Sequence, residues 1–99
     1  MMKIEFLEPA QYELDEAIAY YDQQRQNLGS EFLSEVIDSI GRISEYPDAW
    51  QELTSRTRRC LIHRFPYGII YQVRSDIVLI IAVASLHRKP TYWQDRISG

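Results

Sequence analysis

Residues 77–84 constrain the fold more than any other segment, because all eight are apolar and no polar residue alternates with them. A strand with one face in water would alternate polar and apolar side chains. This segment is therefore expected to be a central strand that is covered on both faces. It is far shorter than the ~20 residues that a membrane-spanning helix needs, so no contact with a membrane is expected.

The residues before this strand show a helical period as far as Pro47. Glu8-Pro9 suits the start of a first helix, because proline fits the first turn and an acid there favours the helix dipole. Its apolar stripe continues to about residue 24. Ser30 is expected to cap a second helix, which Pro47 ends. The short connection predicts an antiparallel helical hairpin.

The remaining segments have the shorter period of strands. They predict an α+β fold in which the helical hairpin packs on one face of a mostly antiparallel sheet. The opposite face is left for a functional site. With 99 residues, the whole chain 1–99 is expected to form a single domain. The expected strands are residues 3–7, 50–53, 58–65, 69–74 and 77–84, followed by a short C-terminal helix at 91–97.

Charge is unevenly distributed along the chain. The first fifty residues hold three Lys and Arg against eleven Asp and Glu, whereas the rest hold eight against three. Such polarity steers charged partners. The single cysteine, Cys60, allows no intramolecular disulfide and is expected to be a core residue. No signal peptide is evident at the start, so a cytoplasmic location is expected.

Spaced arginines in the second half are the candidate binding groups, since a guanidinium presents a planar fork of donors to phosphate or carboxylate. Strand polarity predicts two clusters. One joins Arg58, Arg59 and Arg74, and the other joins Arg64 and Arg88. Each single arginine is about equally well explained as a solvated edge charge. The candidate cations for binding nucleic acid or an acidic protein are Arg56, Arg58, Arg59, Arg74 and Lys89.

His87 and Tyr92 are the candidate proton carriers, because both follow the buried strand and lie close to Arg88 in sequence. His63 is expected mid-strand, where a structural role is the better interpretation. Two histidines without ligand spacing predict no metal site. No glycine-rich phosphate loop is present, and no cofactor is expected.

Several motifs resemble the RelE/ParE superfamily of toxins from bacterial type II toxin–antitoxin systems, which includes plasmid stabilisation proteins. The hairpin ends in Tyr46-Pro47, as in that superfamily. The other motifs are Arg58-Arg59-Cys60-Leu61-Ile62, Phe65-Pro66-Tyr67-Gly68-Ile69-Ile70-Tyr71, Ala82-Val83-Ala84-Ser85-Leu86-His87-Arg88-Lys89-Pro90 and Tyr92-Trp93. The resemblance implies a toxin that forms a hetero-oligomer with a cognate antitoxin.

This resemblance implies one of two mechanisms. RelE-like members cut mRNA on the ribosome without a metal, and the matching candidates for catalysis are Arg64, His87, Arg88 and Tyr92. ParE-like members poison DNA gyrase and cut nothing themselves. The chain has only two lysines, Lys3 and Lys89, whereas RelE-type sites often use several. Ribosome-dependent mRNA cleavage is the first hypothesis and gyrase poisoning the second. A binding module without toxicity is the third.

Overall fold

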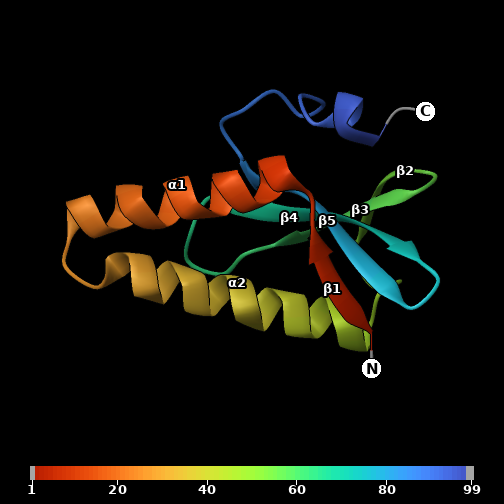
Figure 1. Cartoon of the computed structure of the whole chain (residues 1–99), viewed down its shortest axis with the longest axis horizontal. Coiled ribbons are helices and arrows are strands. Elements are labelled where there is room, and N and C mark those ends of the chain that lie inside the picture. Colours follow the sequence, from red (N-terminus) through yellow and green to blue (C-terminus); the bar gives the residue numbers. More distant parts are fainter. Residues whose placement is uncertain (1, 98–99) are drawn as a thin grey trace.

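The computed structural model describes residues 2–97, which form a helical hairpin, a five-stranded sheet and a short terminal 3₁₀ turn (Figure 1). This arrangement confirms the expected α+β class and the expected order of elements. In chain order the elements are β1 (Lys3–Phe6), α1 (Glu8–Gln24), α2 (Leu28–Glu45), β2 (Gln51–Thr54), β3 (Thr57–Leu61), β4 (Tyr67–Arg74), β5 (Ile77–Ser85) and η1 (Gln94–Ile97).

Both helices follow from local signals, with one correction at the start of α2. Pro9 lies in the first turn of α1, as its missing N–H predicts. α2 begins at Leu28, so Ser30 is inside the helix and does not cap it. The residue at the cap position is Asn27, whose φ of 71° lies in the left-handed region that asparagine tolerates. No helix among residues 2–97 is long and apolar enough to cross a membrane.

The sheet has the strand order β1-β5-β4-β3-β2. β1 pairs with β5 in parallel, and the other neighbours are antiparallel. β5 therefore lies between β1 and β4, and most of its side chains are buried. This confirms the central strand that the uninterrupted apolar run predicts.

The third strand is shorter than expected. β3 ends at Leu61, so the prediction of a strand over residues 58–65 is wrong at its C-terminal end. The chain bends there because Arg64 has a φ of 72° and Pro66 has no N–H to give to a ladder. Tyr67 already belongs to β4, and His63 consequently lies in an exposed loop and not mid-strand.

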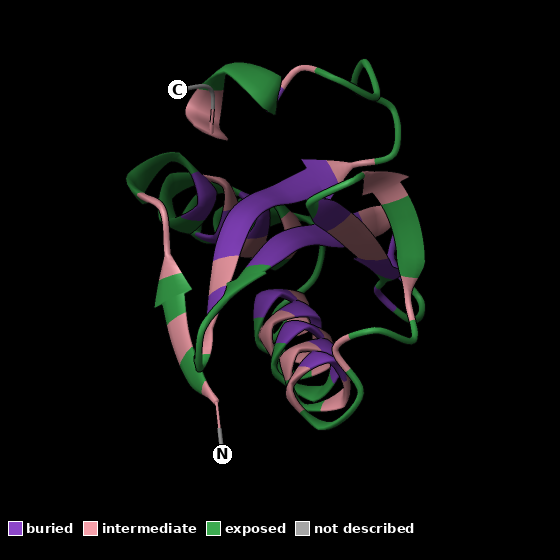
Figure 2. Ribbon diagram, turned by 90° about the vertical axis from the view of Figure 1, so that its right-hand side faces the viewer, coloured by how far each residue is buried: buried purple, intermediate pink, exposed green. Residues whose placement is uncertain are grey.

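Apolar side chains form two buried clusters, one on each face of the sheet. The buried residues concentrate in the central strands and in α2 (Figure 2). The larger cluster lies between the sheet and the helices, with Phe32, Val36 and Ile43 from α2 at its centre. A smaller cluster on the opposite face forms around Trp93, which is 1% exposed. The C-terminal segment thus covers part of the face that was expected to be open. Only the rest of this face is available to a ligand.

Candidate functional site

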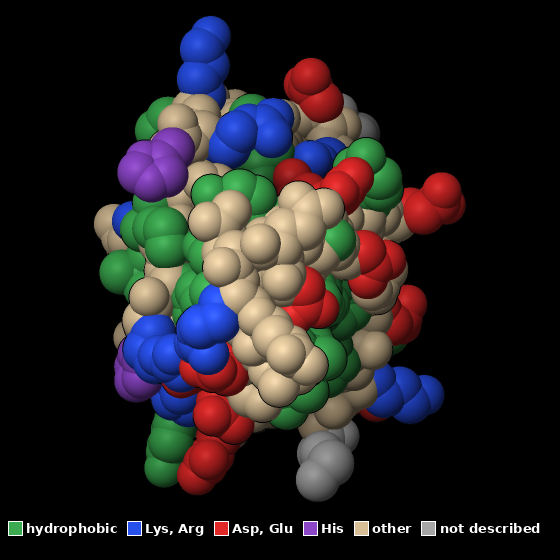
Figure 3. Space-filling view, turned by 90° about the vertical axis from the view of Figure 1, so that its left-hand side faces the viewer, with side chains coloured by type: hydrophobic (Ala, Val, Ile, Leu, Met, Phe, Trp, Pro, Cys, Tyr) green, Lys and Arg blue, Asp and Glu red, His purple; other side chains and the backbone are tan. Residues whose placement is uncertain are grey.

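Basic and acidic side chains are unevenly distributed over the surface, although they lie side by side where Arg25 and Arg64 pair with Glu31. Figure 3 looks onto the α1–α2 end and shows acidic side chains over much of the right-hand flank. Lys and Arg side chains gather at the top and on the left, close to both histidines. The charge asymmetry of the sequence is thus also an asymmetry of this face of the molecule.

Glu13 of α1 is the centre of the most highly connected polar group. Arg96 donates from Nη1 to Oε1 and from Nη2 to Oε2 of Glu13, both at 2.9 Å. The Tyr92 hydroxyl donates to Oε2 at 2.7 Å. The side chains of Glu13 and Arg96 are only 14% and 19% exposed, so this bidentate pair is largely shielded from water.

The same group closes the outer edge of β5. β1 pairs with β5 only as far as Phe6 opposite Ile80, so the following part of β5 has no strand on that side. There the Val83 N–H donates to Glu13 Oε1 at 3.1 Å. The Ile81 carbonyl accepts from Arg96 Nη1 at 3.0 Å. Side chains thus satisfy backbone groups that a sixth strand would otherwise pair.

Two guanidinium groups lie close to the Tyr92 ring. The Cζ atom of Arg88 is 4.1 Å from the centre of the Tyr92 ring and that of Arg96 is 5.1 Å from it, both within the range of cation–π attraction. Burial raises the pKa of Tyr92 well above its ordinary value, and the hydrogen bond to Glu13 raises it further. Its hydroxyl is therefore a weak acid that is already bound to a carboxylate.

Arg64 and Arg88 do not form the cluster that strand polarity predicts. Arg64 donates to Glu31 Oε1 of α2 at 2.7 Å and lies 3.9 Å from Glu35 Oε2. Arg88 is instead beside Tyr92. The prediction failed because Arg64 lies in the loop after β3, where its left-handed backbone directs the chain toward α2.

The other predicted cluster is divided between the two faces of the sheet. Arg58 donates to Trp50 O at 2.8 Å and to Glu52 Oε1 at 3.4 Å. Arg59, the next residue, donates to Gln51 Oε1 at 2.8 Å. Adjacent residues of a strand point to opposite faces, so these two arginines cannot share one site.

Arg59 instead shares a small hollow with residues that follow β5. The hollow has a volume of about 70 Å³, and its cations are Arg59, Arg88 and Lys89. Tyr92 and Trp93 also line it. The Nε of Arg59 is buried and has no hydrogen-bond partner in the part of the chain described. Three cations thus surround one concave site on the face opposite the helices, where an anion would be stabilised.

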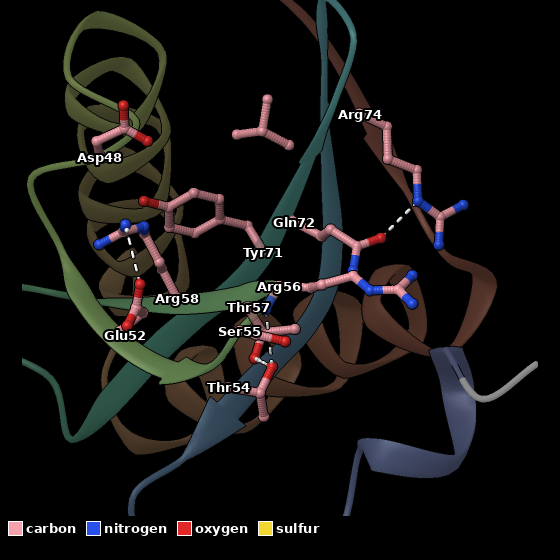
Figure 4. A pocket seen from close by; sticks show the side chains of 11 residues that line it. Asp48, Glu52, Thr54, Ser55, Arg56, Thr57, Arg58, Tyr71, Gln72 and Arg74 are labelled. Atoms are coloured by element: carbon pink, nitrogen blue, oxygen red, sulfur yellow. Dashed lines mark hydrogen bonds and ion pairs between the residues drawn. The ribbon is translucent and has the colours of Figure 1, made fainter.

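A larger hollow of about 480 Å³ lies at the start of β3 and the end of β4 (Figure 4). It is lined by Arg56, Arg58 and Arg74. Arg74 donates from Nε to the side chain of Gln72. Tyr71 lies on the side nearer α2 and donates its hydroxyl proton to Pro47 O. Burial raises the pKa of Tyr71 to about 12, so it remains protonated at neutral pH.

His87 and Lys89 lie exposed in the turn after β5. The His87 backbone N–H donates to Ser85 Oγ at 3.3 Å, which helps to fix the turn. Within residues 2–97, no group of three or more His, Cys, Asp and Glu side chains is placed to hold a metal ion.

Sequence reasoning missed Glu13 and Arg96, the two residues that organise the site. An acidic residue on a helix face and an arginine in a terminal turn both resemble solvated surface charges. The only available signal was the position of Glu13 within the apolar stripe of α1, one residue before the buried Leu14.

The family model described as "ParE toxin of type II toxin-antitoxin system, parDE" matches residues 4–90. Among curated proteins, none has a sequence similar enough to count as a match.

Two solved structures share the fold. The first belongs to a chromosomal ParDE toxin–antitoxin system from P. aeruginosa, with a TM-score of 0.74 and 12% identity, covering 86% of this chain and 96% of that chain. The second is the isolated E. coli RelE toxin, with a TM-score of 0.66 and 19% identity, covering 96% of this chain and 95% of that chain. At these identities the likeness shows the fold alone.

Proposed function

Because the chain belongs to the ParE family of toxins from type II toxin–antitoxin systems, we propose that it arrests growth by poisoning DNA gyrase and does not itself cut nucleic acid. The observation that carries the proposal is the state of Tyr92. Its hydroxyl is bound to Glu13 at 2.7 Å, and two guanidiniums lie close to its ring. Tyr92 therefore acts as a structural bridge between α1 and the C-terminal segment.

The remaining candidates for catalysis do not converge on one point. Cleavage by a 2′-hydroxyl needs a proton acceptor, a proton donor and cations around the same phosphate. Arg64 is paired with Glu31 on α2, whereas Arg88 lies against Tyr92. The raised pKa of Tyr92 makes it a poor proton donor at neutral pH. This arrangement favours a toxin that acts by binding.

The exposed turn after β5 is the contact surface that we assign to gyrase. His87, Arg88 and Lys89 are all exposed there. A cognate antitoxin would neutralise the toxin in a hetero-oligomer, by laying an acidic or amphipathic segment across the basic strands. If this contact is largely electrostatic, its affinity falls as the salt concentration rises.

A gyrase cleavage assay tests the proposal. Purified toxin is added to gyrase, ATP and supercoiled plasmid, and the linear DNA released by detergent and protease is measured. Toxin-dependent linear DNA is expected. Tyr92→Phe should retain this activity within a few fold, because the variant keeps the ring, and circular dichroism would confirm its fold. Unchanged gyrase products at saturating toxin would refute the proposal.

Ribosome-dependent mRNA cleavage is the second candidate, and the small hollow on the face opposite the helices favours it. Arg59, Arg88 and Lys89 line that hollow together with Tyr92, so a phosphate bound there would meet three cations. In this case primer extension on translating ribosomes would show new mRNA ends. Tyr92→Phe and Arg88→Ala would each abolish these ends while gyrase remained unaffected. The response to Tyr92→Phe thus separates the two mechanisms.

A further inference from the structure

Three hollows lie in a row from the start of β3 and the end of β4 to the turn after β5. The first is the 480 Å³ hollow of Arg56, Arg58 and Arg74. The second, of about 340 Å³, shares Arg56 with the first and reaches Trp93. The third is the small hollow of Arg59, Arg88 and Lys89, which Trp93 also lines. The first two hollows adjoin, whereas Trp93, which is 1% exposed, forms a wall between the second and the third. We call this row of three hollows the basic path.

The charges along this path are mostly positive and only partly neutralised. Asp48 and Glu52 line the first hollow, and Glu52 pairs with Arg58. No carboxylate lines the second or third hollow in the part of the chain described. None of the ion pairs formed within residues 2–97 uses Arg56, Arg74 or Arg88. Arg74 donates to the Gln72 side chain and Arg88 lies against the Tyr92 ring, so guanidiniums without a carboxylate partner among these ion pairs lie at both ends of the path.

The first hollow divides into two sides in Figure 4. Asp48, Glu52 and Arg58 lie on the side nearer α2, where the charges offset one another. Arg56 and Arg74 extend together on the other side. The Ser55 hydroxyl lines the same hollow as a further donor, whereas the Thr54 hydroxyl already bonds Thr57 Oγ1 and accepts from the Arg56 N–H. Several donors that surround one point can each bond an oxygen of a tetrahedral phosphate group.

We propose that Arg56 and Arg74 form a phosphate subsite, which holds one phosphodiester of a nucleic-acid strand that continues through the second hollow toward Arg88. This is a contact between the toxin and the nucleic acid itself. It goes beyond the proposed action on gyrase and does not depend on it. The bound strand is DNA or RNA, since both present the same phosphate.

An acidic protein segment fits the first hollow less well. Protein interfaces gain most of their affinity where apolar and aromatic side chains are buried in pockets. Val73 is the single exposed apolar side chain that lines this hollow within the described residues. The path therefore favours a phosphate backbone.

The chain as a whole carries a formal net charge of −3, so its total charge opposes the binding of a nucleic acid. A polyanion is not attracted by the total charge, so binding has to come from the local cations. Removing one cation from the path should weaken binding, and removing one elsewhere should not. Arg25 serves as the matched control, because it lies at the α1–α2 connection and pairs with Glu31.

The test measures fluorescence anisotropy of labelled single-stranded DNA and RNA oligonucleotides with the purified full chain over a series of salt concentrations. Arg56→Ala and Arg74→Ala should each weaken binding roughly tenfold at low salt. Each should also reduce the slope of log K against log salt by about 0.7. Arg25→Ala should leave both quantities unchanged. Comparing DNA with RNA shows which strand is preferred.

Three outcomes would overturn the proposal. One is the absence of oligonucleotide binding at low salt by the folded wild-type chain. Another is an unchanged salt slope in the Arg56→Ala/Arg74→Ala double variant when its thermal unfolding matches wild type. The third is tighter binding of a poly-glutamate peptide than of either oligonucleotide, which would assign the hollow to an acidic protein. The assay contains neither gyrase nor ribosomes, so its result is independent of the proposed function.

Discussion

At the scale of single residues, Glu13 has the largest structural role of any charged side chain in the site. One carboxylate joins α1 to the edge of β5 and to the C-terminal segment, through Val83, Tyr92 and Arg96. Such a group is stable in a low-dielectric place because its charge is paired and its oxygens are hydrogen-bonded. The position of Arg88 therefore depends on a helix residue, since Arg88 stacks on Tyr92.

Replacing Glu13 by glutamine should destabilise the protein strongly. Glu13→Gln removes the charge that Arg96 needs in a largely shielded place, and breaking such a pair costs about 3 kcal/mol. Urea unfolding at neutral pH measures the change. Glu16→Gln, an exposed change on the same helix, should alter the free energy of unfolding by less than about 0.5 kcal/mol. Equal stabilities of the two variants would contradict the assigned role of Glu13.

Glu31 should make stability depend on pH in the acid range. The hydrogen bond from Arg64, and then that from Arg25, hold the pKa of Glu31 below its ordinary value of 4.5. A carboxylate with a lowered folded-state pKa stabilises the protein above its unfolded pKa. This contribution is lost as the pH falls through the folded-state pKa. NMR titration should find Glu31 titrating below 4.5, and closer to it in Arg64→Gln. The same pKa in both proteins would disprove the coupling.

At the scale of elements, the helical hairpin depends on a close approach at Gly29 near the start of α2. A Cβ atom at this position would lie 2.7 Å from Asp22 Oδ1 and still closer to the backbone carbonyl of Ile18. The Gly29 N–H donates to the same carboxylate at 2.8 Å. Glycine is thus needed where α2 passes α1, although the sequence suggests only a helix break there.

Two glycine substitutions in α2 test this packing. Gly29→Ala should destabilise the protein by about 2 kcal/mol, because the backbone of α1 cannot easily move away. Gly41→Ala is the matched control, since no heavy atom lies within 4 Å of its Cβ position. This second change should stabilise the protein by about 0.5–1 kcal/mol through better helix propensity. Thermal unfolding of both variants decides the matter, and a harmless Gly29→Ala would contradict the close approach.

At the scale of the whole molecule, the sheet is covered by the helices on one face and partly by the C-terminal segment on the other. The attachment of the C-terminal segment depends on Trp93, whose indole N–H donates to Pro90 O at 2.8 Å. Together with the Glu13 group, it holds the segment that carries Arg88 and Lys89. The end of the basic path at Arg88 and Lys89 therefore depends on the attachment of this segment, whereas Arg56 and Arg74 lie outside it.

Trp93→Ala should release the C-terminal segment from the sheet. The loss of a fully buried indole costs about 3–5 kcal/mol, so the measurement needs conditions in which the variant remains folded. Hydrogen exchange should then become faster at Tyr92, Gln94 and Arg96, whose N–H groups form the backbone bonds of this segment. Amides of α2 should exchange only as fast as the global unfolding of the variant allows. Uniform loss of protection would show that the segment does not open separately.

The sequence by itself determined the class of fold, the order of the elements and the burial of β5. These follow from side-chain periods that act within a few residues, where the backbone geometry is fixed by local sterics and local hydrogen bonds. Local signals also gave the start of α1 at Glu8-Pro9 and the end of α2 before Pro47. The candidate cations were found in the same way, but not their grouping.

Only the tertiary structure decided which of these side chains meet. Tyr92 and Arg96 lie 79 and 83 residues from Glu13, and no local pattern records such a pairing. One φ of 72° at Arg64 turned it toward α2, and strand alternation placed Arg58 and Arg59 on opposite faces. Contacts of this kind depend on where a strand ends and on which edge lacks a neighbour. The site was therefore settled by long-range packing, whereas the fold class was settled by local periodicity.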